Sequence, residues 1–237
     1  MTRTLADGLR WMAIGAELVE TAVGRCTDAE LAEDTVLAGW TRKHLVAHVA
    51  ANADALRNLV HWARTGEVRP MYNSNDQRAN DIESGSHREA AELRVWVHEA
   101  AVALAADVAS LTDEQWTHEV VTAQGRTVPA SEIPWMRSRE VMVHATDIGA
   151  GVTFAELPQD FLLALAVDIV AKRSAALDGP AVDVVATDVD RRWSVAGAGA
   201  AVEVRGPLAQ VVAYLAGRPY GQLGSGSAPI PALPRWL

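Results

Sequence analysis

Apolar residues recur at intervals of three and four in four long segments, a spacing that is typical of amphipathic helices. In the first segment Leu5, Leu9, Met12 and Val19 carry the pattern. The spacing predicts helices over residues 4–23, 42–64, 87–110 and 134–148. Four such helices, each with one apolar face, predict a four-helix bundle.

The predicted helix ends coincide with capping residues. Thr41 is a suitable N-cap for the second helix, and Gly66 follows its last turn. Ser131 provides a similar start signal for the fourth helix. Between the helices, residues 67–86 read as a long polar loop and residues 117–131 as extended chain. A loop as long as 67–86 is uncommon in a compact domain and is often functional.

The pattern changes after residue 152. A helix from Pro158 to about Leu177 is followed by short alternating runs and a last helix over residues 208–216. The runs predict strands in an antiparallel meander, at residues 182–185, 192–195 and 201–204. The chain is therefore predicted to be α+β but mainly α. A four-helix bundle over residues 1–155 is followed by a small α+β domain with a short antiparallel sheet over residues 156–237.

Composition narrows the functional classes. The formal net charge is −9, which argues against general nucleic-acid binding because phosphates require a basic surface. Lysine is nearly absent, so an anion site would be built from arginine. Cys26 is the single cysteine, which excludes an internal disulfide and indicates a reducing compartment. Without a signal-peptide pattern or a membrane-spanning apolar run, we expect a cytoplasmic protein with no membrane partner.

Two helical motifs carry metal-competent side chains. His48 lies on an apolar face of the second predicted helix, and Glu140 and His144 lie one turn apart on the fourth. A buried carboxylate needs a cation or another partner. Two histidines and one carboxylate leave a coordination position open, which is the pattern of a catalytic zinc site. These three residues are the predicted ligands of one divalent metal ion.

Other interpretations of these motifs stay open at this stage. Glu140 could instead form an ion pair with Arg137 or Arg139. His44 could be a fourth ligand, or a group near the helix start that does not touch the metal. Asp147 could orient a ligand or be solvated near the helix end. The remaining histidines are flanked by polar residues and read as surface groups, at His61, His87, His98 and His118.

Several stretches resemble the mycothiol-dependent maleylpyruvate isomerases, a family within the DinB-like superfamily. One is Gly39-Trp40-Thr41-Arg42-x-His44-Leu45-x-Ala47-His48-Val49-Ala50, and another is Trp135-Met136-Arg137-Ser138-Arg139-Glu140-Val141-x-x-His144-Ala145-x-Asp147. Further stretches lie at residues 61–72, 122–132, 216–218 and 234–237. The resemblance runs from about residue 36 to the C-terminus.

This resemblance implies a DinB-like bundle with zinc held by His48, Glu140 and His144, and an arginine important for activity that corresponds to Arg218. It implies isomerisation of maleylpyruvate to fumarylpyruvate in gentisate breakdown, with mycothiol as cofactor. A thiolate that adds to the cis double bond creates a single bond that can rotate, and its loss leaves the trans isomer. Arg218 would pair with a substrate carboxylate. The substrate pocket is then expected between the two domains.

The residues that bind mycothiol are not identified by the sequence, although Arg78 in the 67–86 loop is a candidate. An ordinary solvated charge is the alternative for Arg78. We expect a monomer whose partners are a small-molecule substrate and a low-molecular-weight thiol, with no nucleic acid. Two other functions remain: a mycothiol-dependent S-transferase acting on another electrophile, and a non-enzymatic metal-dependent sensor or binding protein.

Overall fold

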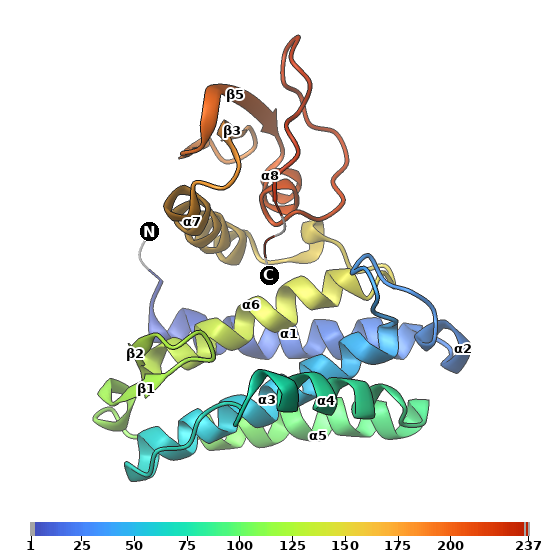
Figure 1. Cartoon of the computed structure of the whole chain (residues 1–237), viewed down its shortest axis with the longest axis vertical. Helices are drawn as coiled ribbons and strands as arrows, with labels where there is room; N and C mark the ends of the chain where they lie inside the picture. Colours follow the sequence, from blue (N-terminus) through green and yellow to red (C-terminus); the bar gives the residue numbers. More distant parts are fainter. Residues whose placement is uncertain (1–2, 235, 237) are drawn as a thin grey trace. The chain divides into compact units, whose positions relative to one another are not determined.

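The computed structural model describes residues 3–234 and 236, and four long helices in it form the bundle predicted for the N-terminal part. They are α1 (Leu5–Arg25), α3 (Arg42–Thr65), α5 (Ala90–Ala109) and α6 (Ile133–Asp147). Helix α1 packs against α6 and α5, and α3 packs against the same two helices (Figure 1). This unit spans Arg3–Val152, and a second unit begins at Thr153.

Capping fixes the ends of the long helices. The Thr41 side chain accepts a hydrogen bond from the His44 backbone nitrogen, and α3 ends at Gly66 in the left-handed conformation, with φ of 78°. Thr4 caps α1 in the same way, through Asp7. The expected cap at Ser131 is wrong, because residues 130–132 form a 3₁₀ turn that runs directly into α6.

Helix α1 lies very close to α6, and this contact fixes the position of α6. A Cβ atom added at Gly15 would lie 2.3 Å from Val141 Cγ2, so only glycine fits at this crossing. The Ser138 hydroxyl donates to the Gly8 carbonyl oxygen at 3.0 Å and adds a polar link between the same helices. Because α6 is held this closely, its opposite face turns toward α3.

The polar segment 67–86 is not wholly a loop. Its second half forms α4 (Asn75–Ser86), which is capped by Ser74 and packs against α3 (Figure 1). Periodicity did not indicate this helix because its buried positions are few: Ile82, Gly85 and Ser86. At Gly85 an added Cβ would lie 2.8 Å from both the Ala47 and Trp96 side chains, so α4 sits directly on α3.

Short elements complete the first unit. The predicted extended segment is a hairpin of β1 (Glu119–Val121) and β2 (Thr127–Pro129), with Val120 opposite Val128. Helix α2 (Asp28–Leu31) follows a capping box at Thr27. Three 3₁₀ turns lie at η1 (Gln115–Thr117), η2 (Ala130–Glu132) and η3 (Phe154–Glu156), the last in the second unit.

The second unit contains α7 (Gln159–Ala176), a three-stranded sheet and α8 (Leu208–Leu215). The strands are β3 (Pro180–Ala186), β4 (Arg191–Val195) and β5 (Ala198–Gly206), in the order β4-β3-β5. Strand β4 is antiparallel to β3, whereas β5 is parallel to it, so the predicted antiparallel meander is wrong. The chain crosses β3 at Gly197, where an added Cβ would lie 2.4 Å from the Gly179 carbonyl oxygen.

The fold class predicted from the sequence, mainly helical α+β with a four-helix bundle, is confirmed apart from this strand direction. Within the described residues, each helix is too short or too polar to cross a membrane.

Candidate metal centre

His48 points into the bundle from the second turn of α3. Only 4% of its surface is exposed, and the residues around it on the helix are apolar and buried. Its ring packs edge-on against Trp40 at 5.3 Å and against His144 at 5.0 Å between centroids. The amphipathic face of α3 therefore delivers this imidazole to α6, as the sequence predicted.

Glu140 and His144 face His48 from α6. Glu140 Oε2 lies 3.0 Å from His48 Nε2 and 3.4 Å from His144 Nε2. One potential ligand atom from each of the three residues lies within 4.8 Å of the others. Two helices thus bring together two nitrogen donors and one oxygen donor, which is a set that suits zinc.

Asp147 acts on His144 from the last turn of α6. Its Oδ2 accepts a hydrogen bond from His144 Nδ1 at 2.8 Å, and the carboxylate is almost wholly buried. This contact leaves His144 Nε2 directed toward Glu140. A carboxylate behind a histidine is the usual partner that orients a metal ligand, so Asp147 fits the supporting role considered from the sequence.

The three groups of the site hold different charges in the absence of a metal. Burial disfavours the cation at His144, but hydrogen bonds to Asp147 and Glu140 outweigh it and raise the pKa of His144 to about 9. Burial would raise the pKa of Glu140, yet the two histidines bring it well below its usual value. Burial lowers the pKa of His48. The site therefore holds one imidazolium, one carboxylate and one neutral imidazole, and a divalent ion could replace the proton of His144.

His44 is occupied elsewhere. Its Nδ1 lies 2.7 Å from Thr41 Oγ1 in the cap of α3, and its Nε2 lies 3.3 Å from Glu83 Oε2 on α4. It is therefore a capping residue that links α3 to α4, and it does not belong to the group of potential ligands.

Arg137 does not neutralise Glu140 by a direct ion pair among the described residues. Its buried guanidinium donates from Nη1 to the Val49 carbonyl oxygen at 2.7 Å and to Asn52 Oδ1 at 2.9 Å. Burial lowers the pKa of Arg137 to about 10. The guanidinium of Arg139 lies 5.8 Å from the centre of the Trp135 ring. The carboxylate of Glu140 thus meets the histidines, and Arg137 joins α6 to the backbone of α3.

Arg78 reaches the site from α4. Its Nη2 lies 3.5 Å from His48 Nδ1, and its guanidinium lies 5.9 Å from the centre of the Tyr72 ring. The sequence placed Arg78 in a loop, but the helix α4 is what directs it toward His48. Trp40 lies against His48 and Tyr72 lies against Arg78. The sequence assigned neither aromatic residue a role, because an aromatic residue beside a polar segment gives no specific signal.

Arg218 lies in the second unit, where it is buried. Its Nη1 donates to the Ala216 and Trp236 carbonyl oxygens, each at 2.9 Å. These bonds fasten the C-terminal segment to the turn at Gly217, which has φ of 65°. Arg218 therefore has a structural role within its own unit, and its predicted role toward substrate stays a prediction.

Comparison with known proteins identifies the family. The model for the mycothiol maleylpyruvate isomerase N-terminal domain matches residues 12–149. A crystal structure of the mycothiol-dependent maleylpyruvate isomerase is 40% identical, with a TM-score of 0.94 over 100% of both chains. A histidine-to-alanine mutant under the same enzyme name is 39% identical, with the same TM-score and coverage. Among curated proteins, no sequence matches significantly. The chain belongs to the mycothiol maleylpyruvate isomerase family.

Proposed function

We propose that the protein converts maleylpyruvate to fumarylpyruvate, using mycothiol and a zinc ion at His48, Glu140 and His144. The observation that carries the proposal is the buried set of two imidazoles and one carboxylate, in a chain that matches the isomerase along its whole length. Within this proposal the enzyme acts as a cytoplasmic monomer in gentisate breakdown.

The thiol must come from outside the chain. Cys26 is buried, and its Sγ lies 3.5 Å from the Ala22 carbonyl oxygen. Burial raises the pKa of this thiol, so little thiolate would form at neutral pH. A zinc ion in the site would supply an open position that lowers the pKa of an external thiol. Reversible thiolate addition to the cis double bond then permits the rotation that isomerises the substrate.

The protein's own groups hold and orient the reacting partners. His48, Glu140 and His144 supply the ligands, and Asp147 keeps His144 Nε2 facing the cation. Once His48 binds a cation through Nε2, its remaining proton lies on Nδ1, which faces the Arg78 guanidinium. Two donors would repel, so the Arg78 guanidinium would lose this partner and would be available to the thiol cofactor. Arg218 is proposed to bind a carboxylate of the dicarboxylate substrate.

An ultraviolet assay of zinc-loaded protein tests the proposal. Maleylpyruvate should be consumed and fumarylpyruvate formed only when mycothiol is present. His48→Ala should abolish this turnover, whereas Asp113→Asn, at an exposed position away from the ligands, should not change it. If the protein accelerates conjugation of monobromobimane to mycothiol above the uncatalysed rate while maleylpyruvate is untouched, the protein is an S-transferase and the isomerase proposal is wrong.

A further inference from the structure

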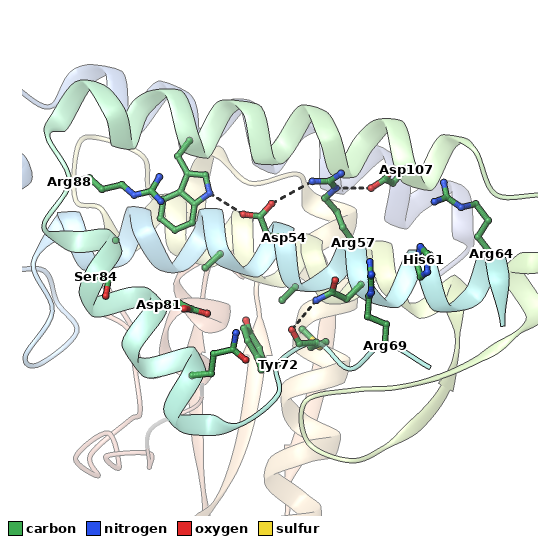
Figure 2. Close-up of a pocket in the computed structure, with 17 residues that line it drawn as sticks. Asp54, Arg57, His61, Arg64, Arg69, Tyr72, Asp81, Ser84, Arg88 and Asp107 are labelled. Carbon is green, nitrogen blue, oxygen red and sulfur yellow. Dashed lines mark hydrogen bonds and ion pairs between the residues drawn. The ribbon is translucent and has the colours of Figure 1, made fainter. Parts of the chain in front are cut away.

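A cavity lies beside α3, lined by residues other than the three candidate metal ligands. It is a cavity of about 690 Å³ between α3, α4 and α5 (Figure 2). We refer to it as the α3–α4–α5 cavity. Its volume lies within the range of small-molecule sites.

Polar side chains with unused hydrogen-bonding capacity face this cavity. Arg64, Arg69 and Asp81 line it, and in the described part of the chain their side chains have no hydrogen bond or ion pair. In Figure 2 Arg64 and Arg69 lie toward one end, whereas Asp81 and Ser84 lie toward the other. The two ends thus present donors and acceptors to the same space.

A fixed network forms the wall between these ends. Trp96 Nε1 donates to Asp54 Oδ2 at 3.0 Å, and Arg57 Nε donates to Asp107 Oδ2 at 2.6 Å. The Arg88 guanidinium lies 4.1 Å from the centre of the Trp96 ring. Because these groups hold one another, the wall is pre-organised and its shape does not depend on a ligand.

The charges in the cavity favour a hydroxyl-rich ligand over an anion. Four arginines line the cavity, but so do three aspartates, at Asp54, Asp81 and Asp107. An anion would meet these carboxylates, whereas a hydroxyl can donate to a carboxylate and accept from a guanidinium. The cavity also has apolar surface, from Ala51, Ala55 and Met71, against which the C–H face of a sugar ring can pack.

Tyr72 and Arg78 connect the cavity to the metal centre. Tyr72 lines the cavity, and its ring contacts Arg78, which in turn approaches His48 Nδ1 at 3.5 Å. Ala51, on the cavity wall, lies three residues after His48 on the same helix. A ligand seated here could therefore extend one short arm toward the metal ligands.

We propose that the α3–α4–α5 cavity binds the glucosaminyl-inositol part of mycothiol, an inference that rests on the proposed function. Mycothiol joins this pseudodisaccharide to N-acetylcysteine, so nearly all its hydroxyl groups lie away from its sulfur. The Asp81 carboxylate accepts hydrogen bonds from those hydroxyls, and the Ser84 hydroxyl donates or accepts. The guanidinium groups of Arg64 and Arg69 donate to the same hydroxyls. Tyr72 and Arg78 line the course of the cysteinyl arm.

Titration calorimetry on the full-length zinc-loaded protein tests this assignment. Glucosaminyl-inositol without its cysteine should bind and should compete with mycothiol. Asp81→Ala and Arg69→Ala should each weaken both ligands at least tenfold, because each loses a charge-assisted hydrogen bond. The matched exposed changes Asp113→Ala and Arg191→Ala should leave both affinities unchanged.

Kinetics and anion probes separate the alternatives. The cavity variants should raise KM for mycothiol while zinc content and KM for maleylpyruvate stay the same. Unchanged affinity for glucosaminyl-inositol in both variants would overturn the assignment, as would binding of succinate or inorganic phosphate without any binding of the sugar. If the wild-type protein binds glucosaminyl-inositol in this cavity but has no isomerase activity, the proposed function fails and the sugar site stands.

Discussion

Zinc binding is expected to release about one proton from His144. In the metal-free site this imidazole donates to both Asp147 and Glu140, and its pKa is about 9. A metal ligand must be deprotonated, so the ion has to displace the proton on Nε2. His48 adds no second proton, because burial lowers its pKa.

The size of the effect follows from the pKa. A pH of 6.5 lies about 2.5 units below the pKa of His144. Removing the proton at this pH opposes zinc binding by about 3 kcal/mol. Deprotonation of His144 should therefore raise the apparent affinity roughly tenfold per pH unit, a contribution that levels off near pH 9 at roughly 300-fold. At pH 6.5, half a unit below the pKa of about 7 that zinc gives to bound water, roughly a quarter of that water is ionised, so water adds only about 0.2 proton.

Titration of zinc into metal-free protein in buffers of different ionisation enthalpy counts the released protons. Asp147→Asn should lower the pKa of His144, so fewer protons are released at pH 6.5. The same variant should bind zinc roughly 10–100-fold more weakly at pH 9, because the ligand loses the carboxylate that orients it. A wild-type value near zero at pH 6.5, or an affinity that does not change with pH, would refute the charge state derived for His144.

Four further outcomes test the fold and the site. His48→Ala should lose zinc, measured by metal analysis, while circular dichroism shows the helices intact. Gly15→Ala should destabilise the protein by about 1–3 kcal/mol in urea unfolding, because its Cβ meets Val141, whereas Gly24→Ala, in open space, should not destabilise it. Arg137→Met should cost about 1–3 kcal/mol, since the Val49 carbonyl oxygen loses its buried donor. Arg218→Ala should cut turnover roughly a hundredfold with zinc retained, and should also lower Tm because two carbonyl oxygens lose their donor; turnover close to wild type would leave Arg218 with its structural role alone.

The proximity of the three candidate metal ligands was predictable because helical spacing fixes the faces on which they lie. Glu140 and His144 are four residues apart and share a face, and His48 lies among apolar neighbours that turn it inward. The charge state was not predictable. It depends on Asp147 Oδ2 lying 2.8 Å from His144 Nδ1, a distance set by the local geometry of α6. Sequence spacing offers Asp147 as a partner but does not decide whether it is buried.

Strand order in the second unit illustrates a different limit. The alternating runs identify β3, β4 and β5, but alternation is the same in parallel and antiparallel strands. The direction of β5 is determined where the chain crosses β3 at Gly197, a glycine whose close approach to Gly179 is visible only in three dimensions. A short connection usually joins two strands that pair with each other in antiparallel fashion. Here β5 follows β4 by a short connection but pairs with β3 instead.

Helix α4 was missed for a reason that bears on function. Hydrophobic periodicity detects a helix by the apolar face that it buries. The residues of α4 that face the α3–α4–α5 cavity are instead polar or small, namely Gln77, Asp81, Ser84 and Gly85. Its sequence therefore resembles a solvated loop, although it packs on α3 and carries Arg78 to His48. A helix whose inner face is polar offers hydrogen-bonding groups to a ligand, so the place where the local pattern fails is also the place where we locate the thiol cofactor.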